Sequence, residues 1–175
     1  LVGRNENFIS NCYATGSVTT PPRENVGGLV GHTWKNPGTN IIPVVEKSFA
    51  IGKVTGSANT GGLVGYNENS TISKSFYDSI STGRDDDTGK CSPKTTIQMR
   101  TSGTYTDWDW DFTNTWAIDA AGLINNGYPY LRYFGSETVT PPVALSVNIG
   151  ETATPVLFTN SGGITLTADR NEVAK

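Results

Sequence analysis

The sequence predicts an all-β fold, a parallel β-solenoid, from three observations. Short words recur along the chain, turn residues interrupt every apolar run, and apolar residues are few. Hydrophobic residues make up 35 % of the 175 residues, below the usual ~45–50 % of globular proteins. A thin core between short strands needs fewer large apolar side chains than a thick core. The 20 glycines point the same way, because a tight corner needs a residue that tolerates positive φ.

The first recurring word is LVG, which occurs at residues 1–3, 29–31 and 63–65. Gly-Gly pairs at 27–28 and 61–62 precede the last two copies, and we expect these glycines to form corners. Helical periodicity is absent through residue 81, and runs of four to seven residues between turn residues are typical of strands. Repetition of this kind is the sequence signature of stacked repeats.

A second block recurs between the LVG words, as ISNCYATGSV, VEKSFAIGKV and ISKSFYDSIS. Stacked in register, strands lie ~4.8 Å apart and like side chains sit on like. The extra length of the second copy, HTWKNPGTNIIP, reads as an inserted loop. We expect a right-handed coil from the general preference of parallel crossovers. The residues expected to stack are Leu1, Leu29 and Leu63; Cys12, Ser48 and Ser75; and Tyr13, Phe49 and Phe76.

The words NVGGLVGHT, NTGGLVGYN, NCYATGSV and KSFAIGKV resemble the GLUG repeat of bacterial surface proteins, over about residues 1–80. The resemblance implies a large extracellular protein, such as an adhesin or a surface-anchored peptidase with accessory repeats. It implies an extracellular or cell-surface location and assigns no ligand. Because the chain lacks an initiating Met and begins inside a repeat, we expect a fragment whose targeting signal lies upstream.

Residues 81–135 are predicted to form an aromatic-rich cap. The last turn of a stack exposes an apolar cross-section and a strand edge, which a cap must cover. Thr95 or Thr96 is the expected N-cap of a short helix. In GLUG-like proteins the repeats end in a segment of similar order, which implies the same boundary here. Its words in this chain are TT with Met99, WDF at 110–112, WAI at 116–118 and GYPYL at 127–131.

Two tryptophans of this segment, Trp108 and Trp110, are the candidate ligand-binding residues. The structural interpretation gives all four tryptophans a packing role, since each large aromatic buries ~150–250 Å². The alternative is that Trp108 and Trp110 stack on sugar rings. Acidic and aromatic residues alternate from 107 to 112, and in a strand they would face opposite ways.

The end of the chain is predicted to be separate. Residues 136–143 form a proline-containing linker. Residues 144–175 contain three strand-like runs, at 144–149, 155–159 and 164–168. They are interpreted as the start of an immunoglobulin-like module, which normally needs ~100 residues, or as a donated strand that completes a neighbouring subunit.

No catalytic constellation is found in the sequence. His32 is the only histidine and is read as a variable surface position. Cys12 and Cys91 do not have a metal-site spacing, and they are interpreted as small core residues rather than a disulfide. Asp85, Asp86 and Asp87 form a candidate calcium site, because calcium prefers carboxylate oxygens; the alternative is a solvated loop. We otherwise expect no cofactor.

These observations favour a non-catalytic structural or adhesion module, whose partner is an extracellular glycan or protein. A net charge of -3 with scattered Lys and Arg argues against nucleic acid, and no apolar run is long enough for membrane insertion. One alternative is a filament subunit that self-associates through its C-terminal strands. The other is a carbohydrate-active β-helix enzyme, which needs two carboxylates ~5–9.5 Å apart, and the repeats supply no aligned acids.

Overall fold

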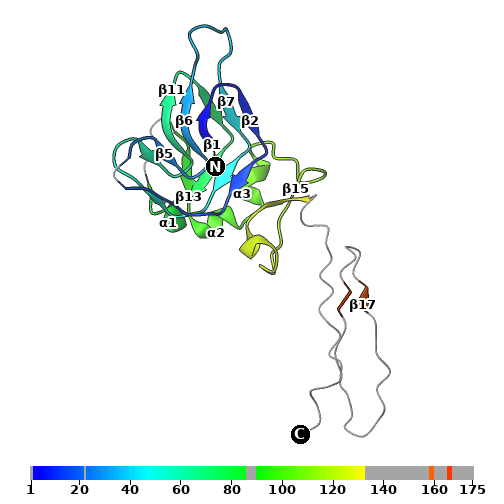
Figure 1. Ribbon diagram of the computed structural model, residues 1–175. Coiled ribbons are helices and arrows are strands. Elements are labelled where there is room, and N and C mark those ends of the chain that lie inside the picture. Colours follow the sequence, from blue (N-terminus) through cyan, green and yellow to red (C-terminus); the bar gives the residue numbers. More distant parts are fainter. Residues whose placement is uncertain (1, 22, 86–89, 133–157, 160–164, 167–175) are drawn as a thin grey trace, which may run out of the picture. The chain divides into compact units, whose positions relative to one another are not determined.

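The computed structural model is mostly β-strand with a few short helices, which confirms the predicted all-β class. The chain divides into two compact units, Leu1–Thr138 and Val139–Lys175, drawn in Figure 1. The structure describes residues 2–21, 23–85, 90–132, 158–159 and 165–166.

Parallel sheets account for the repeats, and they join equivalent strands from successive copies. The first contains β1 (Val2–Asn5), β6 (Val30–Trp34) and β11 (Val64–Glu68); the second contains β2 (Phe8–Ser10), β7 (Val44–Glu46) and β12 (Thr71–Ser73). The third contains β3 (Tyr13–Ala14), β8 (Phe49–Ala50), β13 (Phe76–Asp78) and β14 (Ser92–Lys94). Two further pairs are β4 (Val18–Thr19) with β9 (Val54–Thr55), and β5 (Val26–Gly27) with β10 (Thr60–Gly61).

The register between strands is the register that the repeated words predict. Val30 of the second LVG word pairs with Val2 on one side and Val64 on the other. Phe49 likewise pairs with Tyr13 and Phe76. Like side chains therefore stack on like. The inserted loop between β6 and β7 projects from the ends of these strands (Figure 1).

The core lies between the stacked sheets. It contains the leucines of the last two LVG words, Leu29 and Leu63, together with the neighbouring valines. Leu1, the third expected member of this ladder, lies outside the described residues. The aromatic row of Tyr13, Phe49 and Phe76 belongs to a second cluster, built with the chain that follows the repeats.

The Gly-Gly pairs were predicted to form corners because glycine tolerates positive φ, but none of these four glycines has a positive φ. Positive φ at the repeat turns is instead carried by asparagines and lysines, namely Asn11, Asn25, Lys47, Asn59, Asn69 and Lys74. The glycines permit close approach. A Cβ on Gly28 would lie 2.3 Å from the carbonyl oxygen of Gly62, and a Cβ on Gly62 would lie 2.1 Å from the ring of Tyr77.

Substituting Gly62 with alanine is expected to destabilise the first unit by about 2 kcal/mol or more, as overpacking does in rigid cores. Tyr77 is fully buried, so its ring cannot swing into solvent. Gly16 is the matched control, because a Cβ there meets nothing within 4 Å. Urea unfolding followed by tryptophan fluorescence measures both. Equal midpoints for the two variants would show that the Gly62 contact is not tight.

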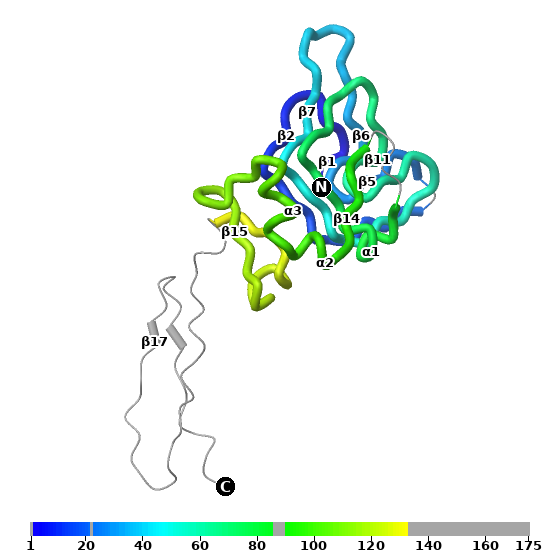
Figure 2. The backbone as a smooth tube through the Cα atoms, turned by 180° about the vertical axis from the view of Figure 1, so that it is seen from behind, coloured from blue at the N-terminus to red at the C-terminus, as the bar shows by residue number. Residues whose placement is uncertain are grey.

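The chain after the repeats adds one strand to the stack and then runs along its side. It contains α1 (Ser79–Thr82), α2 (Thr96–Met99), α3 (Gly103–Thr106), β15 (Trp116–Ala117), η1 (Asn125–Gly127) and β16 (Tyr130–Leu131). Thr95 caps α2 in a capping box with Gln98, which confirms the predicted helix start. β14 covers β13, and β15 pairs antiparallel with β16. Figure 2 shows α1 and α2 below the strands, and α3 and β15 to one side of them.

In the second unit, the structure describes one antiparallel pair, β17 (Phe158–Thr159) with β18 (Thr165–Leu166). These strands fall in the second and third of the three predicted runs. The first run, 144–149, and the predicted linker, 136–143, lie outside the described residues.

Candidate functional site

The outer side of the sheet β1–β6–β11 carries two rows of side chains. Each row runs across the sheet and takes one side chain from each strand or its continuation. Arg4, His32 and Tyr66 occupy the first row in register. In the second row, Trp34 pairs with Glu68, and Glu6 follows β1 at the matching position. The residues between the rows, Asn5 and Thr33, are buried, so the two rows face outwards. We call Arg4, Glu6, His32, Trp34, Tyr66 and Glu68 the charged–aromatic face.

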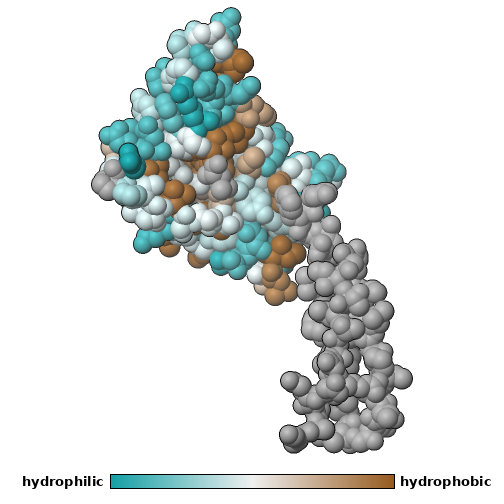
Figure 3. Space-filling view, viewed as in Figure 1, coloured by the Kyte–Doolittle hydropathy of each residue, from teal (hydrophilic) through white to brown (hydrophobic). Residues whose placement is uncertain are grey.

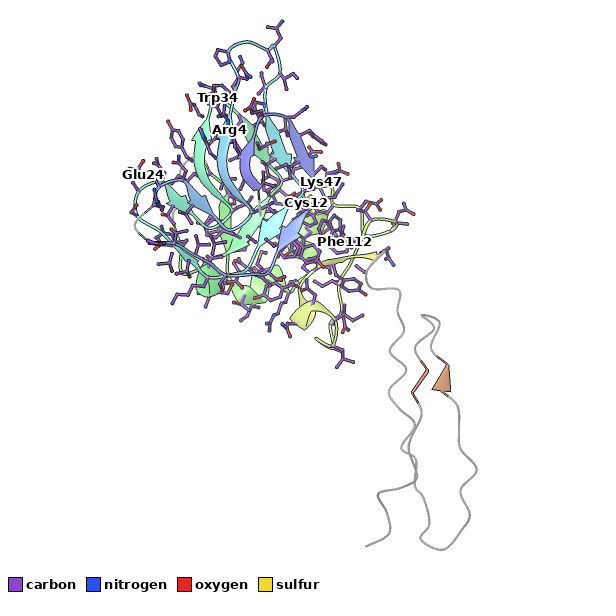
Figure 4. All side chains as sticks on the ribbon, in the orientation of Figure 1. Arg4, Cys12, Glu24, Trp34, Lys47 and Phe112 are labelled. Atoms are coloured by element: carbon purple, nitrogen blue, oxygen red, sulfur yellow. The ribbon has the colours of Figure 1, made fainter. Side chains whose placement is uncertain are left out.

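Contacts within the charged–aromatic face hold its side chains in place. The guanidinium of Arg4 lies 3.6 Å from the ring centroid of Trp34, and its Nε donates to Glu6 over 2.9 Å. Figure 4 shows Arg4 and Trp34 side by side. The ring centroids of His32 and Tyr66 are 5.0 Å apart, and Nε2 of His32 is 3.2 Å from an oxygen of Glu68.

The face remains open to solvent despite these contacts. The exposed fractions are 47 % for the Arg4 side chain, 41 % for Glu6 and 39 % for Glu68. Asn36 of the projecting loop donates its side-chain amide to Glu6, which ties the loop to this corner. The face therefore presents rings, a guanidinium and carboxylates together at the surface.

Sequence reasoning missed this site because it judged His32 alone. His32 was aligned with Tyr66 and read as a variable surface position. The alignment was right, since the two residues pair across β6 and β11. The available signal was the period of two in RNE, HTW and YNE, which places six polar or aromatic residues on one side of the sheet.

The two predicted ligand-binding tryptophans are in different environments. Trp110 is 4 % exposed, and its indole N–H donates to the carbonyl of Lys74. Trp108 is 44 % exposed and packs edge-on against Phe76. A ligand can therefore reach Trp108 but not Trp110 in this conformation. Residues 107–112 do not form a strand; residues 107–109 form a turn, in which Asp109 has a positive φ.

Trp110 and Trp116 are the centre of an aromatic cluster along the outer face of the sheet β3–β8–β13–β14. Their ring centroids are 4.6 Å apart. Trp116 contacts Tyr13 and Phe49, and its N–H donates to the side chain of Asn11. The segment thus spans strands of all three copies. Phe112, labelled in Figure 4, packs against this cluster.

Asp109 bridges two lysines at the turns of successive copies. Nζ of Lys47 and Nζ of Lys74 each lie 3.3 Å from the same oxygen of Asp109. Hydrogen bonds from these lysines lower the pKa of Asp109. The carboxylate is 80 % exposed, so the bridge contributes little to stability.

Asp78 is the buried carboxylate that joins the last repeat to the following segment. One oxygen accepts the backbone N–H groups of Ile80 and Ser81, which caps α1. The other accepts from the hydroxyls of Thr96 and Tyr128, at 2.7 and 2.6 Å. The sequence analysis noted only that the repeats supply no aligned acids. The signal it overlooked was that Asp is a common N-cap, the position that Asp78 takes at the start of α1.

Two of the three residues of the predicted calcium site lie outside the described residues, so the site stays a prediction. Asp85 is exposed, whereas Asp86 and Asp87 lie outside the described residues. Within the described part of the chain, no group of three or more His, Cys, Asp or Glu side chains could hold a metal ion.

Cys12 and Cys91 occupy opposite ends of one row across the four-stranded sheet. The strand pairings place Ser48 and Ser75 between them. Three strand spacings put their Cα atoms about 14 Å apart, whereas a disulfide needs ~4.4–6.8 Å. The two cysteines therefore do not pair with each other within one chain. Burial raises the pKa of the Cys12 thiol.

A polar pocket of about 450 Å³ lies beside the last copy. It is lined by residues 67, 70–72 and 90–92. These side chains offer hydroxyls, an amide, a thiol and one lysine. They do not include a pair of acids.

Comparison with known proteins agrees with the repeats. Residues 1–19 match the family described as "The GLUG motif". These residues carry the GLUG motif. The matched residues contain β1 to β4, and the strand pairings extend β1, β2 and β3 to two further copies and β4 to one. No solved structure matches the chain.

One relative comes from Evansella cellulosilytica and is named "Putative Gly-rich membrane protein". It is 36 % identical over 126 residues, which cover 68 % of this chain and 14 % of the relative. The chain thus corresponds to a small part of that protein. None of the helices described in the present structure has the length and apolar character needed to cross a membrane.

Proposed function

We propose that this chain is a non-catalytic segment of a bacterial extracellular surface protein. In this proposal the GLUG repeats form a right-handed β-solenoid that acts as a spacer and binds an extracellular glycan or protein. The observation that carries the proposal is the in-register stacking of Arg4, His32 and Tyr66 on an exposed sheet face. Stacked repeats need only thin cores, and they leave one continuous side for contact with a partner.

The surface location is supported by the relative's printed name and by the GLUG motif. The adhesive role is supported by the chemistry of the exposed residues. The buried acid of the last copy, Asp78, accepts four hydrogen bonds from the protein itself. Its lone pairs are thus engaged in structure, which favours binding over acid–base chemistry for the described part of the chain.

A glycan array probed with the whole chain, first with calcium and then with EDTA, tests this function. We expect binding to at least one glycan. Loss with EDTA, and on changing Asp85, Asp86 and Asp87 to asparagine, would place the site at the acidic triplet. Binding that survives EDTA and fails in Trp108→Ala would place it on the aromatic segment. Absence of binding to glycans and to host-surface proteins would contradict an adhesive role.

A further inference from the structure

We propose that the charged–aromatic face is the binding site for a neutral, linear glycan chain. This inference rests on the proposed adhesive function and assigns it to residues of β1, β6 and β11. The predicted site at Trp108 lies on a different sheet, against Phe76, so the two assignments can be separated by mutation.

The residue types of the face fit a sugar. A sugar ring has apolar C–H faces surrounded by hydroxyls. The ring of Tyr66, which is 36 % exposed, offers apolar contact area with a negative π-face, and the ring of Trp34 supports the guanidinium of Arg4. The carboxylates of Glu6 and Glu68 accept hydrogen bonds from hydroxyls, and the guanidinium of Arg4 donates to them. Small-molecule sites commonly combine aromatic area with a few fixed polar groups in this way.

The charge of the face argues against an ionic polymer. Arg4 is neutralised by Glu6 at 2.9 Å, and Glu68 faces His32 at 3.2 Å. No stretch of one sign is present along the six residues, so the electrostatic attraction that polyanions require is missing. A ligand recognised by alternating donors and acceptors, rather than by net charge, fits this arrangement.

The geometry suits a repeating ligand. The register positions recur on three strands, ~4.8 Å apart, and they line up Arg4, His32 and Tyr66 along the stacking direction. The Arg4–Trp34 and His32–Tyr66 contacts hold the side chains before binding. This lowers the entropy cost of ordering long side chains in the complex.

A folded protein partner fits the face less well. A stable protein interface uses ~20–30 residues on each side, whereas this face has six. Phe8, Ile41 and Ile42 are also exposed. Figure 3 shows apolar patches on the projecting loop and below it. Even with these residues, the set is far smaller than such an interface.

Affinity electrophoresis of the whole chain tests the proposal, with gels that contain galactomannan, hydroxyethylcellulose or the acidic polymer alginate. We expect retardation by at least one neutral polymer and none by alginate. Tyr66→Ala should weaken binding by about tenfold, the loss expected when one stacking contact is removed. Tyr66→Phe should keep most of the affinity, because it keeps the ring. Leu123→Ala, at a side chain that is 88 % exposed, is the control and should bind like the parent. Loss of binding in Trp108→Ala would place the site on the aromatic segment and overturn this inference.

Tryptophan fluorescence checks that the variants are folded, and Glu68→Gln gives a second readout that retains side-chain volume. Neutral-polymer binding that Tyr66→Ala and Glu68→Gln leave unchanged would overturn the inference while the adhesive function stands. Retardation by alginate alone would overturn the ligand class. No retardation by any polymer would also overturn the inference. In that case, binding to a host-surface protein would still support the adhesive function.

Discussion

Replacement of Trp116 with alanine is expected to cost about 3–5 kcal/mol of unfolding free energy, the usual loss for a buried tryptophan. Trp116 is fully buried. Its ring packs against Tyr13, Phe49 and Trp110, and its N–H donates to Asn11. The substitution removes ring contacts to two copies at once. It should therefore loosen the aromatic segment from the strands.

Urea unfolding measures this loss, and binding of a hydrophobic dye reports the newly exposed aromatic row. All four tryptophans lie in the first unit, so their fluorescence reports that unit alone. Trp108→Ala is the matched control, because Trp108 is 44 % exposed; it should cost about 1 kcal/mol or less. Equal losses for the two variants would show that Trp116 does not hold the segment in place.

Replacement of Asp78 with alanine is expected to cost about 3 kcal/mol or more, because it leaves buried donors unsatisfied and removes a helix cap. The orphaned groups are the hydroxyls of Thr96 and Tyr128 and the first N–H groups of α1. Asp78→Asn keeps the shape and one carbonyl acceptor. It should cost less, on the order of 1–2 kcal/mol.

The midpoint of urea unfolding compares these variants with Asp85→Ala, which changes an exposed acid and should be neutral within ~0.5 kcal/mol. An alanine variant at position 78 as stable as the parent would mean that Asp78 is not a structural anchor. The order expected for stability is parent, Asp78→Asn, then Asp78→Ala.

The repeated words were sufficient to predict the strands and their pairing. Identical words imply identical environments, and Tyr13, Phe49 and Phe76 do pair in register. The role of the glycines was harder to predict, because sequence distinguishes poorly between a residue chosen for positive φ and one chosen for lack of a Cβ. Asn11, Lys47 and Lys74 take the positive φ, and Gly62 gives room to the ring of Tyr77.

The packing of the following segment could not be read from its sequence. Alternating acids and aromatics from 107 to 112 suggested a strand, but Asp109 turns the chain and places Trp110 inside the cluster. The charged–aromatic face could have been predicted from the sequence, since its residues alternate along three aligned segments of the repeats. It was missed because each residue was weighed singly, and recognition comes from the cross-strand contacts that only the register brings together.

Incubation of the whole chain with a neutral polysaccharide, followed by measurement of both bound protein and polymer length, distinguishes a binding module from an enzyme. We expect the polymer to retain the protein and to be recovered at its original length. Shortened polymer would show cleavage and contradict a binding module, and absence of retention on every polymer and host-surface protein would contradict adhesion.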